Sequence, residues 1–166
     1  MIDYKIKTWK TLSKNDTGET HSHQSGISIP KEVAKTSIFP QLGTDTINPR
    51  VEVVFYDEND NAYKFQYIYY NDVFFRPDKK RGHNEFRITC VKDYIGKNSI
   101  KSGDKIWFAL DKNNVRRIGF ERASTTNETE QVNEPEKDNK DNKQFVLVLK
   151  GGWKCINYSG GNKNAR

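Results

Sequence analysis

Apolar side chains at every second position of residues 62–70 constrain the fold of this chain more than any other feature. The segment reads AYKFQYIYY, with aromatic residues from Tyr63 to Tyr69 and the polar Lys64 and Gln66 between them. This period of two is typical of a β-strand with one buried face. The polar cluster DENDN, residues 57–61, predicts a turn that joins this strand to a second one over 51–56. The centre of the chain is therefore predicted to be a β-hairpin.

Further strands are predicted at 6–12, 105–110 and 115–120, and a second hairpin over 144–150 and 153–158 turns at Gly151-Gly152. Only two short helices are indicated. One follows Pro30 over residues 31–39, with Val33, Ala34 and Ile38 toward the core, and the other covers 91–96 and is expected to end at Gly96. Many short strands with few helices predict a β barrel or sandwich.

Length and composition narrow the class of protein. The chain has 166 residues, of which 12% are aromatic, so it is long enough to bury the core of one domain. It contains no apolar run near 18 residues and no apolar signal segment at its N-terminus, so no membrane association is expected. Cys90 and Cys155 are too few for a disulfide framework, which favours reduced thiols and a cytoplasmic protein.

Charge is unevenly distributed along the chain. The net charge is +6, but residues 124–143 hold six acids and three lysines, a net of −3, so the remainder carries +9. A strongly basic body without membrane features indicates a polyanionic partner, most often nucleic acid. The acidic segment 124–143 is predicted to be a mobile loop inside one domain spanning 1–158, with 159–166 a flexible tail or linker.

Two polar stretches carry side chains suited to reading DNA bases. Asn and Gln match the edge of adenine, Arg matches guanine, and Asp or Glu accepts from the amino group of cytosine. The first stretch, LSKNDTGETHSHQSGISIP at 12–30, contains such groups, and the second, FFRPDKKRGHNEFRIT at 74–89, contains HNEFR. On an extended backbone Glu85 and Arg87 share a face. These stretches predict two loops, or arms, that lie against a duplex.

Other functions remain open at this stage. His21 and His23 form one H-x-H pair, which is a weak zinc signal. Pro77-Asp78 with the two DNK triplets at 138–140 and 141–143 matches the Mg²⁺-binding pattern of many nucleases, which gives a small Mg²⁺-dependent nuclease as the alternative. The tyrosine-rich strand 62–70 would suit stacking in a single-strand or RNA binder. Neither a Gly-x-Ser-x-Gly motif nor a P-loop occurs in the sequence.

The first stretch closely resembles the first DNA-contacting arm of the EcoRII-type restriction endonuclease effector domain. The resemblance includes LS-x-NDTG, the following HQ-x-G and the Ile-Pro that leads into a helix. IYYN at 68–71 and NE-x-RIT at 84–89 are similar to that family's aromatic strand and second arm. SIKSGDKIWFAL at 99–110 is similar to the Gly-Asp strand start of the plant B-three DNA-binding domains, which share the fold. Two differences stand in the second arm: a longer segment between Phe75 and Asn84, and Phe86 where a basic residue is expected.

The resemblance implies a seven-stranded pseudobarrel with two short helices, whose two arms bind the major groove of double-stranded DNA sequence-specifically. It implies the effector or targeting domain of a type II restriction endonuclease, non-catalytic by itself and without a cofactor, with Mg²⁺ needed only by a separate nuclease domain. The family's target CCWGG, where W is A or T, is the first expectation for the site. A stand-alone DNA-binding regulator is a further alternative. The predicted DNA-binding residues are Lys10, Ser13, Lys14, Asn15, Asp16, Thr17, Gly18, His23 and Gln24 in the first arm, and Lys79, Lys80, Arg81, His83, Asn84, Glu85 and Arg87 in the second.

Overall fold

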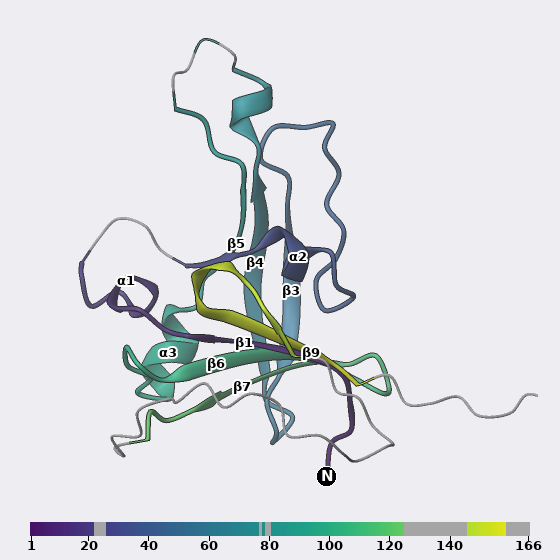
Figure 1. Ribbon diagram of the computed structural model, residues 1–166, viewed down its shortest axis with the longest axis vertical. Helices are drawn as coiled ribbons and strands as arrows, with labels where there is room; N and C mark the ends of the chain where they lie inside the picture. Colours follow the sequence, from purple (N-terminus) through teal and green to yellow (C-terminus); the bar gives the residue numbers. More distant parts are fainter. Residues whose placement is uncertain (22–25, 77, 79–80, 125–145, 159–166) are drawn as a thin grey trace, which may run out of the picture.

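The computed structural model describes residues 1–21, 26–76, 78, 81–124 and 146–158, which form a mainly β pseudobarrel (Figure 1). Its strands hydrogen-bond in the order β2-β5-β4-β3-β7-β6-β1-β9-β8. All pairs are antiparallel except β3 with β7. The strands are β1 (Tyr4–Thr11), β2 (Ile27–Ile29), β3 (Arg50–Tyr56), β4 (Ala62–Tyr70), β5 (Glu85–Thr89), β6 (Lys105–Asp111), β7 (Arg116–Glu121), β8 (Val146–Val148) and β9 (Trp153–Asn157).

The mainly β pseudobarrel is confirmed, but the described residues form nine strands and not seven. Every strand predicted from alternation is present, and β2 and β5 are additional. They have only three and five residues, and alternation over so few positions is a weak signal for a strand. They become strands because β5 lies between β2 and β4 and pairs with both.

Alternation along β4 correctly predicted its buried face. Phe65, Tyr67 and Tyr69 are 2%, 0% and 8% exposed. The rings of Phe65 and Tyr67 join a core that also holds Phe39, Phe55, Phe108, Tyr94 and Trp153. The aromatic strand therefore fills the core, and the stacking platform considered for a single-strand or RNA binder is wrong.

A side-chain hydrogen bond links the two ends of the sheet. The indole Nε1 of Trp153 on β9 donates to the backbone oxygen of Ser28 on β2, at 3.2 Å. These strands lie near opposite ends of the hydrogen-bonded order, so the contact closes the pseudobarrel where the described residues form no strand pairing. In Figure 1, β3 to β5 run along the long axis of the molecule and cross β1, β6 and β7 steeply.

The helices are short, and two predicted helix ends are corrected. After Pro30, α2 (Lys31–Ala34) stops well before residue 39. The Thr36 hydroxyl donates to the Val33 oxygen at 2.6 Å, and Pro40 disfavours helical backbone at the residue before it. The core positions Val33, Ala34 and Ile38 are buried as predicted.

The second helix, α3 (Lys92–Lys97), runs through Gly96 instead of ending there. Its end is fixed by Asn98, whose side-chain Nδ2 donates to the Tyr94 oxygen at 2.8 Å. A further one-turn helix, α1 (Lys14–Thr17), was not predicted, and neither were two 3₁₀ turns, η1 (Asp72–Phe74) and η2 (Lys150–Gly152).

Several predictions fall on residues that the structure does not describe. These are most of the acidic segment 124–143 and the tail 159–166, so the predicted loop and linker stay predictions. Cys90 is exposed, Cys155 is buried, and both are free thiols. Within the described ranges, no helix has the length and apolar character needed to cross a membrane.

Candidate nucleic-acid interface

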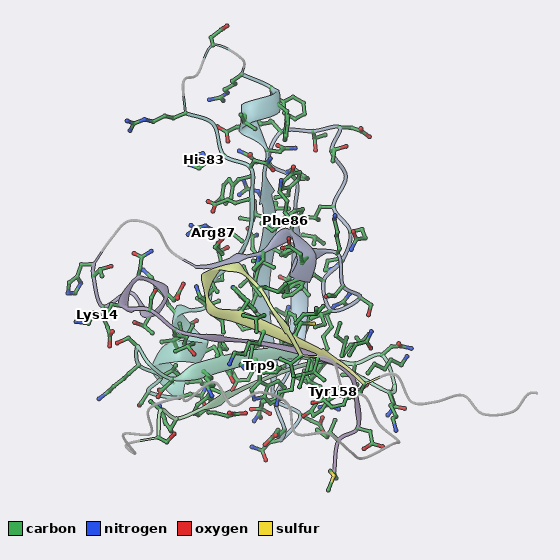
Figure 2. The ribbon with its side chains drawn as sticks, in the orientation of Figure 1. Trp9, Lys14, His83, Phe86, Arg87 and Tyr158 are labelled. Carbon is green, nitrogen blue, oxygen red and sulfur yellow. The ribbon has the colours of Figure 1, made fainter. Side chains whose placement is uncertain are left out.

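Two polar arms leave the sheet on either side of the short strands β2 and β5. The first arm, residues 12–26, connects β1 to β2, and the second arm, residues 71–84, connects β4 to β5. Arg87 on β5 lies opposite Ser28 on β2 and Ile68 on β4, so this strand joins the bases of both arms. Figure 2 shows Lys14 on the first arm, His83 on the second and Arg87 between them.

The first arm is built around one carboxylate. Ser13 caps α1 by accepting from the Asp16 backbone N–H at 3.3 Å, and Asp16 Oδ2 accepts from the Ser13 N–H and hydroxyl at 2.8 Å each. This reciprocal pair is a capping box. Lys10 Nζ donates to the Asp16 carboxylate at 2.8 Å, and the two side chains are only 12% and 7% exposed. Asp16 and Lys10 therefore hold the arm to the end of β1.

The remaining first-arm residues differ in their surroundings. Lys14 is exposed, and Asn15 Oδ1 accepts from the Thr20 hydroxyl at 3.2 Å. The Thr17 hydroxyl donates to backbone oxygens of its own helical turn. Gly18 ends that turn with φ of +80°, which glycine adopts without strain, and its N–H donates to the Asn15 oxygen while its own oxygen accepts from the His21 N–H. His23 and Gln24 lie outside the described residues.

The base of the first arm is fixed by a turn that sequence reasoning placed only as a strand start. Leu12 N–H donates to the Asp104 oxygen and Gly103 N–H donates to the Leu12 oxygen, both at 2.8 Å. Asp104 is 5% exposed and accepts from the backbone N–H of Lys101 and Ala123, at 2.9 Å each. These backbone bonds, helped by Arg122 at 3.0 Å, lower the pKa of Asp104 below its ordinary value.

In the second arm, His83 is held by its backbone while its ring is exposed. Its N–H donates to Asp72 Oδ1 at 2.8 Å, and this bond is the main cause of the lowered pKa of Asp72. The ring Nδ1 lies 3.3 Å from the same oxygen, and the side chain is 61% exposed. Asn84 is exposed and its Oδ1 accepts from the Tyr69 hydroxyl at 2.9 Å. Arg81 is exposed, and Lys79 and Lys80 lie outside the described residues.

Glu85 and Arg87 share one face of β5, as their spacing predicted. Arg87 Nε donates to Glu85 Oε1 at 3.3 Å, and the side chains are 12% and 33% exposed. Phe86 points the other way and stacks on Tyr69, with ring centroids 4.3 Å apart and planes 10° apart. A lysine at position 86 would lose that ring–ring stacking.

Sequence reasoning missed the residues that hold the second arm to the sheet. Asn71, 1% exposed, exchanges backbone-to-side-chain bonds with Asn48 at 2.7 and 3.1 Å and donates to the Thr46 oxygen at 2.9 Å. A Cβ on Gly82 would lie 2.5 Å from the Cα and Cβ of Val73, so only glycine fits between the two segments of the arm. The glycine beside HNEFR was the one available signal for this close contact.

The groups considered for metal chemistry are not brought together in what the structure describes. Among the described residues, no three His, Cys, Asp or Glu side chains lie close enough to hold a metal ion. Asp78 is exposed on the second arm, whereas both DNK triplets and His23 fall outside the described ranges. The zinc and nuclease alternatives therefore stay untested.

Comparison with known proteins identifies relatives of the fold. The chain is 30% identical over 115 residues to auxin response factor 25 of Oryza sativa subsp. japonica, and equally to auxin response factor 6 of Arabidopsis thaliana. Each match covers 69% of this chain and 11% of the relative, so the chain spans about a tenth of these curated proteins.

Among solved structures, the Arabidopsis FUS3–DNA complex is similar with a TM-score of 0.52 and 19% identity, over 70% of this chain and 96% of that one. This shows the B3-like fold. The B3 domain of the UbaLAI restriction endonuclease with cognate DNA also matches, with a TM-score of 0.45 and 19% identity over 72% and 68% of the two chains.

The family described as "Restriction endonuclease EcoRII, N-terminal" matches residues 5–106. This range covers β1 to the start of β6, including both arms and the Gly103–Asp104 turn that fixes the first. The chain therefore belongs to the family of EcoRII N-terminal domains of restriction endonucleases.

Proposed function

We propose that this chain binds a specific sequence of double-stranded DNA in the major groove, as the targeting module of a restriction endonuclease. The observation that carries the proposal is the pair of polar arms joined by β5, on which Glu85 and Arg87 share one face. The net charge of +9 outside residues 124–143 supplies the attraction for phosphates. The plant protein of the similar B3-like structure is itself in complex with DNA.

The two arms supply contacts of two kinds, to phosphates and to base edges. Lys14 is exposed and suited to a phosphate, and Lys79 and Lys80 are assigned to phosphates from the sequence alone. Asn15, His83 and Asn84 offer groups that match base edges, and Arg81 is exposed beside them. Lys10 and Asp16 are engaged with each other, so their proposed contribution is to position the first arm.

The chain by itself is proposed to be non-catalytic, with cutting assigned to a nuclease domain elsewhere in the parent enzyme. Supercoiled plasmid incubated with the purified chain and Mg²⁺ should stay intact. Cutting that disappears in Asp78→Ala would instead support the nuclease alternative.

The decisive experiment is a selection of bound duplexes from a random pool, followed by affinity measurement on the enriched site and on scrambled DNA. A specific reader should prefer its site by about 10³-fold or more at physiological salt. Equal affinity for enriched and scrambled duplexes, or preference for single strands, would overturn the proposal. CCWGG, where W is A or T, is the first sequence to compare with the enriched site.

A further inference from the structure

Three consecutive apolar side chains are exposed on the second arm. Val73, Phe74 and Phe75 are 38%, 64% and 42% exposed, in and directly after η1. The arm forms the end of the molecule farthest from the N-terminus (Figure 1). Contiguous exposed apolar groups on a soluble protein mark an interaction site more often than chance. None of these three residues belongs to the polar DNA contacts proposed above.

Backbone hydrogen bonds hold this apolar tip, residues 73–75, in a turn and against the returning segment of the arm. Phe75 and Arg76 N–H both donate to the Asp72 oxygen at 3.1 Å, and Val73 N–H donates to the His83 oxygen at 3.4 Å. Asp72 is 8% exposed and binds His83 in return. The exposed rings therefore belong to a hydrogen-bonded turn and not to a frayed end.

Exposed positive charge on the same arm indicates which class of partner fits the apolar tip. Arg76 follows the tip, and Arg81 lies on the returning segment of the same arm; both are exposed. Apolar rings on an arm that also carries two exposed guanidinium groups fit a partner with anionic groups around an apolar surface. In the major groove of duplex DNA, phosphates flank the base edges, and the apolar feature of those edges is the C5-methyl group of thymine.

We propose that Phe74, supported by Phe75, packs against the C5-methyl group of a thymine when the second arm enters the major groove. This inference rests on the proposed function and adds an apolar contact to its polar ones. Phe74 would then determine specificity at an A·T pair.

The test removes the methyl group and the ring separately. In the selected duplex each thymine is replaced by uracil, one at a time, and the affinities of wild type, Phe74→Ala and Phe74→Leu are measured. Wild type should lose about fourfold at one thymine, because one buried methyl group is worth close to one methylene. Phe74→Ala should bind the thymine duplex about tenfold more weakly and no longer respond to uracil there, while Phe74→Leu keeps part of the response.

Val51→Ala is the matched control, since Val51 is 38% exposed on β3 outside both arms. It should respond to every uracil as wild type does. If Phe74→Ala and wild type respond alike at every position, or the selected site lacks thymine, the inference is wrong although specific binding persists. Absence of any sequence preference in wild type would overturn the proposed function as well.

Discussion

At the scale of single residues, Glu85 is the side chain whose two interpretations differ most. In one it accepts from a cytosine amino group beside Arg87 on guanine, and each such contact is worth about 1–3 kcal/mol of discrimination. In the other it is only the partner of Arg87, at 3.3 Å, in an ion pair worth about 0–1 kcal/mol and without sequence information.

Glu85→Ala should therefore relax discrimination at one C·G pair and leave affinity for random DNA equal or higher, because one negative charge is lost. Binding to a complete set of single-base variants of the site measures this. Glu52→Ala is the control, because it removes the glutamate of another surface ion pair, between Glu52 on β3 and Lys64 on β4 at 3.6 Å, outside both arms. Parallel profiles for wild type and Glu85→Ala would exclude Glu85 from base reading.

Asp16 was predicted to contact DNA, but both of its oxygens already accept bonds within the protein. Asp16→Asn should weaken specific binding with an unchanged base-preference profile, because it loosens the arm and leaves Lys10 without its charged partner. Affinity for random DNA should stay equal or rise, because one negative charge is lost. The loss in unfolding free energy should be about 1–3 kcal/mol. Asp45→Asn, which removes an exposed charge outside both arms, should leave the unfolding free energy nearly unchanged. A change of preference at one base pair in Asp16→Asn would instead make Asp16 a reader.

At the scale of elements, the first arm depends on the turn before β6. Asp104→Asn should lower the unfolding free energy by about 1–3 kcal/mol at pH 7, because an amide cannot accept from all three donors. The pKa of Asp104 is lowered in the folded protein, so its contribution is full above the ordinary value of 3.8 and is lost as pH falls through the lowered value.

Denaturant unfolding from pH 7 to pH 3 should show the difference between wild type and Asp104→Asn constant down to about pH 5 and shrinking below the unfolded pKa. Asp45→Asn, an exposed carboxylate, serves as the control. A difference that grows toward low pH would contradict the assigned direction of the pKa shift.

At the scale of the whole molecule, the basic body predicts steep dependence of DNA affinity on salt. The slope of log affinity against log salt should be about −0.9 for each phosphate contact, and Lys14→Ala should reduce it by about one contact. Lys64→Ala should leave the slope unchanged, because Lys64 lies at the end of β4 remote from the second arm. An unchanged slope in Lys14→Ala would remove Lys14 from the phosphate contacts.

The acidic segment carries the opposite charge to this body. Replacing residues 126–141 with a short Gly/Ser link should leave folding and DNA binding nearly intact, since loop length affects closure entropy only weakly. Binding should tighten slightly at low salt because net negative charge is removed. A full-length variant in which the Asp and Glu residues of this segment are changed to neutral amides separates the effect of charge from that of length. If the deletion variant folds but no longer binds DNA, the segment takes part in binding.

The sequence predicted those features that depend on interactions between residues close together in the chain. By itself it determined the central strands and much of the core, because burial of Phe65, Tyr67, Ile106 and Phe108 follows from local alternation. It also placed Glu85 and Arg87 on one face, and its motifs identified the family. Short segments are different, because β2 and β5 gain their structure from partners distant in the chain.

Only the tertiary structure decided the surroundings of each polar side chain. The family resemblance grouped Lys10 with Lys14 and Asp16 with Asn15, yet the fold pairs Lys10 with Asp16 and exposes Lys14. It also anchors Asn71 and Asp72, and so exposes Phe74 on a fixed backbone. The physical reason is that the backbone period sets which face a side chain takes, whereas its partner and its exposure depend on segments that meet only after folding.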